Sequence, residues 1–313
     1  MNEDDRIFLA GRRGMVGSAI ERALRATGVT NIIGLPSARL DLRDSSAVAA
    51  FFDAEHPDVV ILAAAKVGGI QANRTYPADF MFDNLMIQTN VINLAHRARV
   101  KQFVFLGSSC IYPRDCPQPM KEEYLLTGPL EPTNEAYALA KIAGLRMGQY
   151  YARQFGMPVI NMMPCNLYGP NDSFDPQHSH VLSALVKKFV DAADAGAEEV
   201  VLWGTGAARR EFLHVDDCAR ALLFLLDHWH SADIINVGAG TDLTIKALAE
   251  LIAVKVGYVG RLAWDPSMPD GMPRKCLDVS KIAALGFAPT ISFDASIDGV
   301  IAEYRALKGT RDS

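Results

Sequence analysis

Short apolar runs that alternate with longer helical segments restrict the fold of this chain more than any other feature. The runs contain few polar residues, and they occupy residues 6–10, 31–35, 58–65, 102–107 and 158–163. Segments with helical periodicity lie between them, at residues 15–27, 45–55, 77–97 and 134–155. Strands of a parallel sheet are covered on both faces, so they form continuous apolar runs joined by helices. The pattern predicts an α/β fold with a doubly wound parallel sheet of the Rossmann type.

The regular alternation of apolar runs and helical segments ends after residue 165. A turn-rich stretch, LYGPNDSFDPQHSH, is followed by further helical and strand patterns in a less regular order. We expect a nucleotide-binding domain built from residues 1–165 plus about 213–237. We expect residues of about 166–212 plus 238–313 to form a smaller, discontinuous C-terminal domain that covers the carboxyl edge of the sheet and binds substrate.

Charge and cysteine usage exclude several classes of protein. The 313-residue chain has a net charge of −5 and no long run of one sign, so neither nucleic acid nor a membrane surface is an expected partner. No apolar segment reaches the roughly 18 residues of a membrane span, and the acidic N-terminus is unlike a targeting peptide. Five cysteines without a C-x-x-C pair favour a reducing, cytoplasmic location. His178 and His180 are close together, but no second ligand pair accompanies them, so no metal site is predicted.

A glycine loop follows the first predicted strand directly. In IFLAGRRGMVGSAI, Gly11 permits a tight turn, Gly14 lets the backbone approach a pyrophosphate, and Gly17 lets the helix pack closely on the strand. The amides at the helix N-terminus would face the phosphates. In this strand–loop–helix context the loop predicts dinucleotide binding. The alternative is a tight turn that binds no ligand.

The end of the second predicted strand indicates which dinucleotide is bound. NAD-binding folds usually place an acidic residue there, but IIGLPSARLD has none before Asp41. Arg12 in the glycine loop and Arg39 near the ribose end could instead bind a 2′-phosphate, since a guanidinium binds phosphate in bidentate fashion. We therefore predict NADP(H). The alternative is that both arginines are solvated surface residues.

Three polar residues after the glycine loop have the spacing of a reductase site. Tyr137 and Lys141 are four residues apart, so they share one face of the predicted helix. A neighbouring ammonium is expected to lower the pKa of the phenol, which could then donate a proton near neutral pH. Ser108, at the end of the fourth strand, is placed to hydrogen-bond the same substrate oxygen. The alternative is an ordinary, half-exposed helix face.

These features together resemble the extended short-chain dehydrogenase/reductases over nearly the full length of the chain. One segment, GSSCIYP, distinguishes this chain from the dehydratases of that superfamily. Dehydratases of this superfamily typically have Thr-Asp-Glu at the position of Ser109, Cys110 and Ile111, and their carboxylates perform elimination. A thiol can serve as a base instead, because its pKa is about 8.5 and falls near cations. Dehydration is therefore not expected.

A closer resemblance is to the GDP-L-fucose synthase family, whose members are 3,5-epimerase-4-reductases. The motifs that carry it are, in order, GRRGMVGSAI, AAAKVGGIQAN, PADFMFDNLMIQTNVI, GSSCIYP, NLYGPND, SHVLSALVKKF, WGTGAARREFLHVDDCA and DGMPRKCLDVSK. The resemblance implies GDP-4-keto-6-deoxy-D-mannose as substrate, with Cys110 as base and His180 as acid in epimerisation. It implies that Ser108, Tyr137 and Lys141 serve the reduction. It also implies a homodimer through helices 77–97 and 134–155.

The resemblance also implies two sets of binding residues. NADP(H) is expected to contact Gly11, Arg12, Arg13, Gly14, Met15, Val16, Gly17, Arg39, Asp41, Leu106, Gly107, Ser108, Ser109, Tyr137, Lys141, Pro164, Cys165, Asn166, Leu167 and His180. The nucleotide sugar is expected to contact Lys188, Trp203, Arg210 and Asp270.

One departure from the family pattern leaves an alternative open. The family commonly has Gly-His-Arg-Gly in the glycine loop, whereas this chain has Gly-Arg-Arg-Gly, so either Arg12 or Arg13 could bind the 2′-phosphate. Two other functions also stay open: another nucleotide-sugar reductase or 4-epimerase on the same scaffold, and a non-catalytic relative that binds nucleotide or a protein partner.

Overall fold

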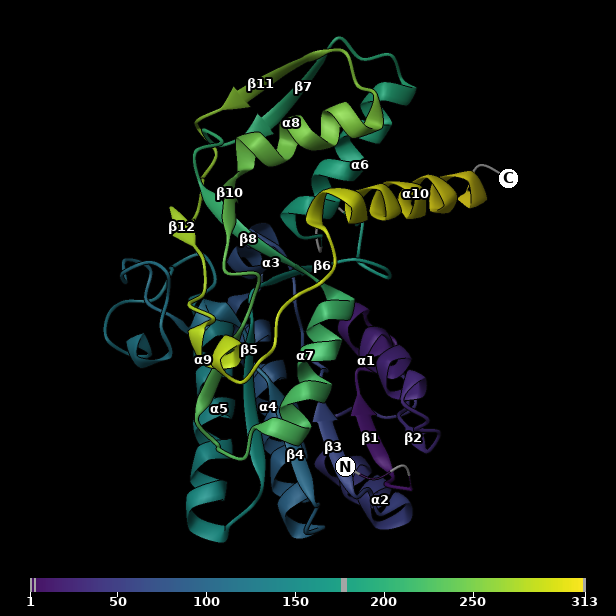
Figure 1. Cartoon of the computed structure of the whole chain (residues 1–313), viewed down its shortest axis with the longest axis vertical. Coiled ribbons are helices and arrows are strands. Elements are labelled where there is room, and N and C mark those ends of the chain that lie inside the picture. The colour runs from purple at the N-terminus through teal and green to yellow at the C-terminus, as the bar shows by residue number, and fades with distance from the viewer. Residues whose placement is uncertain (1, 3, 176–178, 312–313) are drawn as a thin grey trace.

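A six-stranded parallel sheet forms the centre of the computed structural model, which describes residues 2, 4–175 and 179–311 (Figure 1). The spatial order of its strands is β2-β1-β3-β4-β5-β9. Their bounds are Ile7–Ala10 for β1, Ile32–Ile33 for β2, Val59–Leu62 for β3, Gln102–Leu106 for β4, Val159–Pro164 for β5 and Ile234–Val237 for β9. The residues of β1, β3, β5 and β9 are all buried, which explains why their sequences are apolar except for Asn161 in β5 and Asn236 in β9. The predicted doubly wound α/β fold is confirmed.

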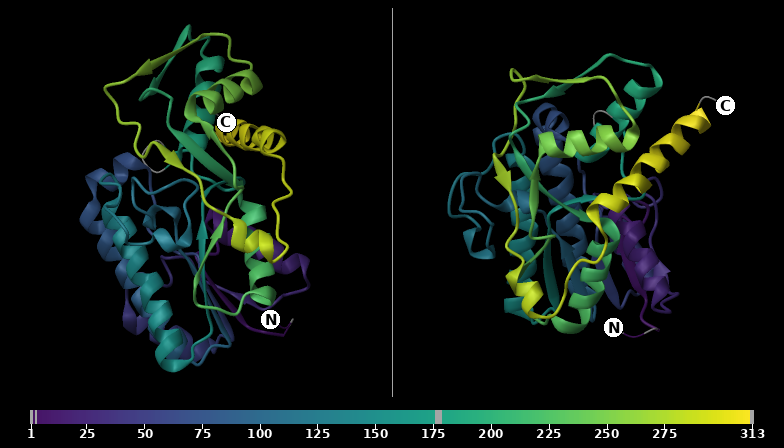
Figure 2. Two further views of the ribbon diagram at one scale, coloured as in Figure 1. Left: turned by 60° about the vertical axis from the view of Figure 1, so that its left-hand side comes forward. Right: turned by 45° about the horizontal axis from the view of Figure 1, so that its top comes forward.

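Helices cover both faces of this sheet. On one face α1 (Met15–Ala26) packs against α7 (Val215–His228). On the other face α4 (Pro77–Arg97) packs along α5 (Glu135–Phe155), with α2 (Ser45–Glu55) beside α4 (Figure 2). A short helix, α3 (Ile70–Thr75), precedes α4.

Two predicted strands are shorter in the structure. The second strand ends at Ile33, since Gly34 and Pro36 follow, and glycine weakens a strand while proline cannot donate to the ladder. The third strand ends at Leu62, and the next three alanines leave the ladder to line a cavity.

The strand order places a crevice above β1. From β1 the chain crosses through α1 to β2 on one side, and from β2 it returns through α2 to β3 on the other side. Adjacent connections that leave in opposite directions open a gap at the carboxyl ends of the strands, where ligands of such folds bind. The glycine loop lies at this point.

Smaller sheets and three helices lie beyond the carboxyl ends of the central strands (Figure 1). One sheet has the order β10-β8-β12, with β6 also paired to β8, and β11 pairs with β7 in a second sheet. These strands are β6 Asn166–Tyr168, β7 Glu199–Trp203, β8 Arg209–His214, β10 Asp242–Thr244, β11 Arg261–Asp265 and β12 Arg274–Lys275. The helices of this part are α6 Val181–Asp194, α8 Ile245–Val256 and α10 Phe293–Arg311.

This covering part has its own group of buried apolar side chains, which includes Phe189, Ile252 and Ile301. Residues 213–237 belong instead to the apolar group around the central sheet, as does a later segment that contains Met272 and α9 (Ser280–Ala284). The boundaries of two separate domains stay a prediction. Among the described residues, no helix combines the length and the apolar character needed to cross a bilayer.

Candidate active site

A single large cavity lies between the central sheet and the covering part. Its volume is about 1610 Å³, above the roughly 300–1,000 Å³ of an ordinary small-molecule site. All but one of the residues predicted above to bind cofactor or substrate, or to act in catalysis, line its wall. Arg39 is the exception, because its side chain is exposed outside the cavity lining. The cavity is large enough to hold a dinucleotide and a nucleotide sugar together.

The glycine loop approaches the sheet too closely for side chains at two of its three glycines. Gly11 has φ +86°, and a Cβ there would lie 2.7 Å from the Ala64 nitrogen. A Cβ on Gly17 would lie 2.1 Å from the carbonyl oxygen of Gly11. Gly14 is the N-cap of α1, and its Cβ would lie 3.5 Å from the Gly11 carbonyl oxygen, an ordinary contact, so this position has room for a side chain. The loop therefore presents bare backbone and a helix N-terminus to the cavity, which suits a pyrophosphate.

The two arginines of the loop lie in different surroundings. Arg12 donates from Nε and from a terminal nitrogen to the carboxylate of Glu21, and to the carbonyl oxygen of Ile32 at 3.2 Å. Arg13 is exposed and lines a small hollow with Gly34. Among the described residues, no ion-pair partner is found for Arg13. Glu21 therefore holds the Arg12 guanidinium in place, and the Arg13 guanidinium is available to bind a ligand.

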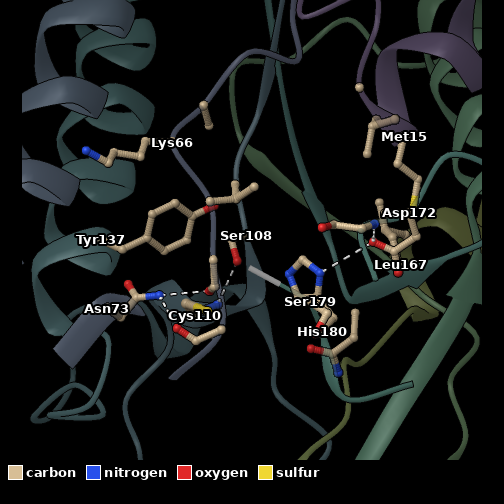
Figure 3. Close-up of a pocket in the computed structure, with 18 of the residues that line it drawn as sticks. Met15, Lys66, Asn73, Ser108, Cys110, Tyr137, Leu167, Asp172, Ser179 and His180 are labelled. Atoms are coloured by element: carbon tan, nitrogen blue, oxygen red, sulfur yellow. Dashed lines mark hydrogen bonds and ion pairs between the residues drawn. The ribbon is translucent and has the colours of Figure 1, made fainter. Parts of the chain in front are cut away.

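Ser108, Tyr137 and Lys141 meet at the end of β4. Ser108 caps the short helix η1 (Ser109–Ile111) and accepts from the Cys110 amide at 3.3 Å. Lys141 Nζ donates to the carbonyl oxygen of Leu106 at 2.8 Å and lies 5.9 Å from the centre of the Tyr137 ring. All three side chains line the cavity, and Figure 3 shows Ser108 and Tyr137 on the same side of it.

Burial has the largest effect on the pKa values of Tyr137 and Lys141. It raises the pKa of Tyr137, and the charge of Cys110 raises it further, while a hydrogen bond to Ser108 opposes both. Burial lowers the pKa of Lys141 to about 8, against the opposing charge of Cys110. The prediction that the pKa of the phenol is lowered is wrong in direction, because removal from water disfavours the phenolate and the charge of Cys110 disfavours it further. Tyr137 therefore stays protonated and suits the role of proton donor.

Cys110 has two polar contacts that the sequence did not indicate. Lys275 Nζ lies 3.1 Å from Sγ, and Asn134 Nδ2 lies 3.1 Å from Sγ on the other side. Burial alone would raise the pKa of the thiol, but the charge of Lys275 and hydrogen bonds from Ser108, Lys275 and Asn134 outweigh it. The pKa of Cys110 is consequently lowered, which suits a base.

His180 lies across the cavity from the cysteine. Figure 3 shows its imidazole between Asp172 and the side of the site that carries Ser108 and Cys110. Its Nδ1 lies 3.8 Å from Oδ1 of Asp172, a residue that sequence reasoning did not select. His178 lies outside the described residues. Within the described ranges, no three His, Cys, Asp or Glu side chains are grouped so that they could hold a metal ion.

The predicted substrate-binding residues line the part of the cavity wall that the covering part forms. Trp203 is 54% exposed at the end of β7 and offers a flat apolar face. Arg210 donates to the carbonyl oxygens of Arg209 and Asp270. The Asp270 carboxylate accepts from the amide and hydroxyl of Thr205, at 2.8 and 2.7 Å, so it also fixes the loop after Trp203. Lys188 donates to the carbonyl oxygen of Val201 at 2.7 Å.

Comparison with known proteins adds independent evidence. Residues 7–238 match the NAD dependent epimerase/dehydratase family. GDP-L-fucose synthase 1 of Arabidopsis thaliana is 56% identical over 287 residues, which cover 92% of this chain and 89% of the relative.

Two solved structures have the same fold. One is a GDP-L-fucose synthetase from Naegleria fowleri bound to NADP, with 28% identity, a TM-score of 0.90 and coverage of 99% and 97% of the two chains. The other is a GDP-mannoheptose C4 reductase from Campylobacter jejuni with NADP bound, with 35% identity, a TM-score of 0.88 and coverage of 97% and 99%.

Proposed function

The chain belongs to the NAD dependent epimerase/dehydratase family, and we propose that it converts GDP-4-keto-6-deoxy-D-mannose to GDP-L-fucose. The reaction consists of epimerisation at carbons 3 and 5 and then reduction at carbon 4. One observation carries the proposal. The Cys110 thiol, which contacts the ammonium of Lys275, lies in the same cavity as the reductive cluster of Ser108, Tyr137 and Lys141.

Epimerisation uses the acidity that the 4-keto group gives to neighbouring carbons. Cys110 removes the proton from carbon 3 or 5, and His180, on the opposite side, returns a proton to the other face. Ser108 and Tyr137 hydrogen-bond the enolate oxygen that forms between these two events. Each inversion therefore requires a base and an acid on opposite faces of the sugar, which matches the placement of the thiol and the imidazole.

Reduction uses the same oxygen-binding position. When bound, the reduced nicotinamide supplies a hydride to carbon 4. Tyr137 then gives its proton to the resulting alkoxide, and its raised pKa keeps that proton available at neutral pH. Lys141, four residues further along α5, holds the nicotinamide ribose and supplies positive charge beside the phenol.

The cofactor is a nicotinamide dinucleotide, and we propose NADPH as the form used. The bare glycine backbone and the N-terminus of α1 fit its pyrophosphate. Arg13 is the residue that we propose for the 2′-phosphate, since Arg12 is already paired with Glu21. Arg13→Ala should weaken NADPH binding while NADH binding changes little, and Arg12→Ala is the matched control. Equal weakening of both cofactors by Arg13→Ala would contradict this assignment.

For the nucleotide end of the substrate we propose Arg210 and Trp203. A guanidinium can bind the GDP diphosphate, and the exposed indole face can pack against the base or sugar. Asp270 and Lys188 complete this end of the cavity.

Product NMR in deuterated water tests the whole proposal. Incubation with GDP-4-keto-6-deoxy-D-mannose and NADPH should give GDP-L-fucose with deuterium at carbons 3 and 5, and hydrogen from the cofactor at carbon 4. Cys110→Ser should slow deuterium incorporation far more than it slows hydride transfer to an already epimerised ketone. Equal slowing of both steps would contradict the division of roles.

A second candidate is a GDP-sugar C4 reductase that does not epimerise. It is favoured by the likeness to the GDP-mannoheptose C4 reductase at 35% identity. Such an enzyme needs no reactive thiol, so NADPH oxidation without deuterium at carbons 3 and 5 would select it.

We also propose a cytoplasmic homodimer joined through α4 and α5. Phe82 on α4 and Tyr150 and Phe155 on α5 are 61%, 51% and 50% exposed, which is unusual for large apolar side chains. Sedimentation of the wild type and of Phe82→Arg tests this assembly. A monomeric wild type would exclude it.

A further inference from the structure

Lys275 contacts Cys110, but no step of the epimerisation or of the reduction passes a proton through it. We propose that Lys275 is a positioning residue that keeps Cys110 in its thiolate form, as the ready base of the epimerisation. The two residues are 165 positions apart in the chain, yet the amine nitrogen lies 3.1 Å from the sulfur. This inference rests on the proposed function for its chemical purpose, but the state of the thiol can be measured without any sugar.

The covering part fixes the position of Lys275 from both sides. In the parallel pairing of β12 with β8, Lys275 lies opposite Arg210, and Arg274 lies opposite Arg209. Arg274 and Arg209 both donate to Asp242 on β10. On the other side of Lys275, the amide of Cys276 donates to Gln118 and the amide of Leu277 donates to Glu211. The backbone therefore directs the Lys275 side chain into the cavity with little freedom.

The other titratable groups around the sulfur do not replace this contact. Tyr137 and Lys141 from α5 and Arg210 from β8 all interact electrostatically with Cys110. Lys141 Nζ, however, donates to Leu106, and the Arg210 guanidinium donates to the backbone oxygens of Arg209 and Asp270. Within the described part of the chain, Lys275 is the cation that hydrogen-bonds Sγ, and the neutral amide of Asn134 is its companion.

A thiolate changes the start of the epimerisation. The sulfur takes the carbon-bound proton directly, and it becomes a neutral thiol as the enolate forms. Protonated His180 then gives its proton to the other face of the carbon and becomes neutral. One proton must afterwards pass from the thiol to the imidazole through solvent, so that the site is restored with no net change in protons.

Alkylation of Cys110 by iodoacetamide across the pH range tests the pairing. The rate follows the thiolate fraction, and mass spectrometry of the Cys110 peptide separates it from the other four cysteines. In the wild type the midpoint should lie below the ordinary value of about 8.5. Lys275→Met should raise it by about 1–3 pH units, the usual effect of removing an opposite charge within contact distance. Lys275→Arg should restore a low midpoint.

Arg274→Gln is the matched control, because it removes a cation from the same strand that faces Asp242 and not the sulfur. Its midpoint should equal that of the wild type. An unchanged midpoint in folded Lys275→Met would overturn the proposal. If Lys275→Met does not fold, thiolate absorbance at neutral pH in the wild type but not in Cys110→Ser supports it, and equal absorbance in the two overturns it. Absence of sugar epimerisation with a low thiol midpoint would reject the proposed function and leave the pairing intact.

Discussion

The lowered pKa of Lys141 predicts where activity should fall as the pH rises. Lys141 is 5% exposed, and burial lowers its pKa from 10.5 to about 8. This shift corresponds to roughly 3 kcal/mol, at about 1.4 kcal/mol for each pKa unit. The ammonium form therefore predominates at pH 7 and is the minor form at pH 9. Since the reduction uses the ammonium, kcat/KM for NADPH should fall about tenfold between pH 7 and pH 9.

NADPH oxidation measured from pH 6 to pH 10 checks this expectation. The parameter kcat/KM reports the free enzyme, which is the state that the structure describes. Lys141→Arg is the informative variant, because its guanidinium stays charged and should remove the alkaline fall even where overall activity is lower. A wild-type profile that stays flat to about pH 9.5 would refute the reasoning about burial.

Burial of Lys141 also makes the free energy of unfolding depend on pH. A lysine whose pKa is lowered on folding contributes stability above its unfolded pKa, and this contribution is lost as the pH falls through the folded value. The free energy of unfolding should therefore rise between about pH 8 and pH 10.5 by this group's contribution. Lys141→Met should remove that rise while it abolishes reduction.

Three further predictions concern other parts of the molecule. Gly17→Ala should weaken NADPH binding at least about tenfold in a fluorescence titration, because its Cβ would meet the Gly11 carbonyl oxygen and the loop must move; unchanged binding would contradict the close packing. Asp172→Asn should slow deuterium incorporation by about tenfold but leave hydride transfer to an epimerised ketone nearly unchanged, since Asp172 faces His180. An equal effect on both steps would show that Asp172 does not assist His180 as the acid. Phe189→Ala should lower the free energy of unfolding by about 3–5 kcal/mol in urea, because the ring is fully buried in the covering part; a loss below about 1 kcal/mol would show that this core collapses around the gap.

Local patterns were sufficient to predict the sheet and the glycine loop, whereas most residues of the cavity wall were predicted from the resemblance to a known family. Apolar runs marked the buried strands, because burial on both faces leaves few polar positions in them, such as Asn161 in β5. Ser108, Cys110 and Tyr137 line one cavity, since each follows or lies beside the carboxyl end of β4, while their roles stay a prediction. Short spacings and strand ends are properties that a sequence contains directly.

Features that depend on distant pairing or on the degree of burial could not be predicted in this way. Lys275 reaches the cysteine because β12 pairs with β8, and no spacing in the sequence indicates that pairing. The pKa of Tyr137 depends on how much water surrounds the phenol, which helical spacing does not determine. Arg12 and Arg13 are adjacent and chemically identical. They differ because Glu21 on α1 pairs with Arg12, and the sequence alone does not show which arginine it reaches.

The distance along the chain between sulfur and ammonium has a consequence for biosynthesis. Amino-terminal parts of a protein emerge and fold first during translation. Cys110 is therefore synthesised well before residue 275 leaves the ribosome. Until then the nascent polypeptide carries an ordinary thiol, mostly protonated and slow to react with oxidants. The enzyme thus acquires its most oxidisable group only after nearly the whole chain has been made.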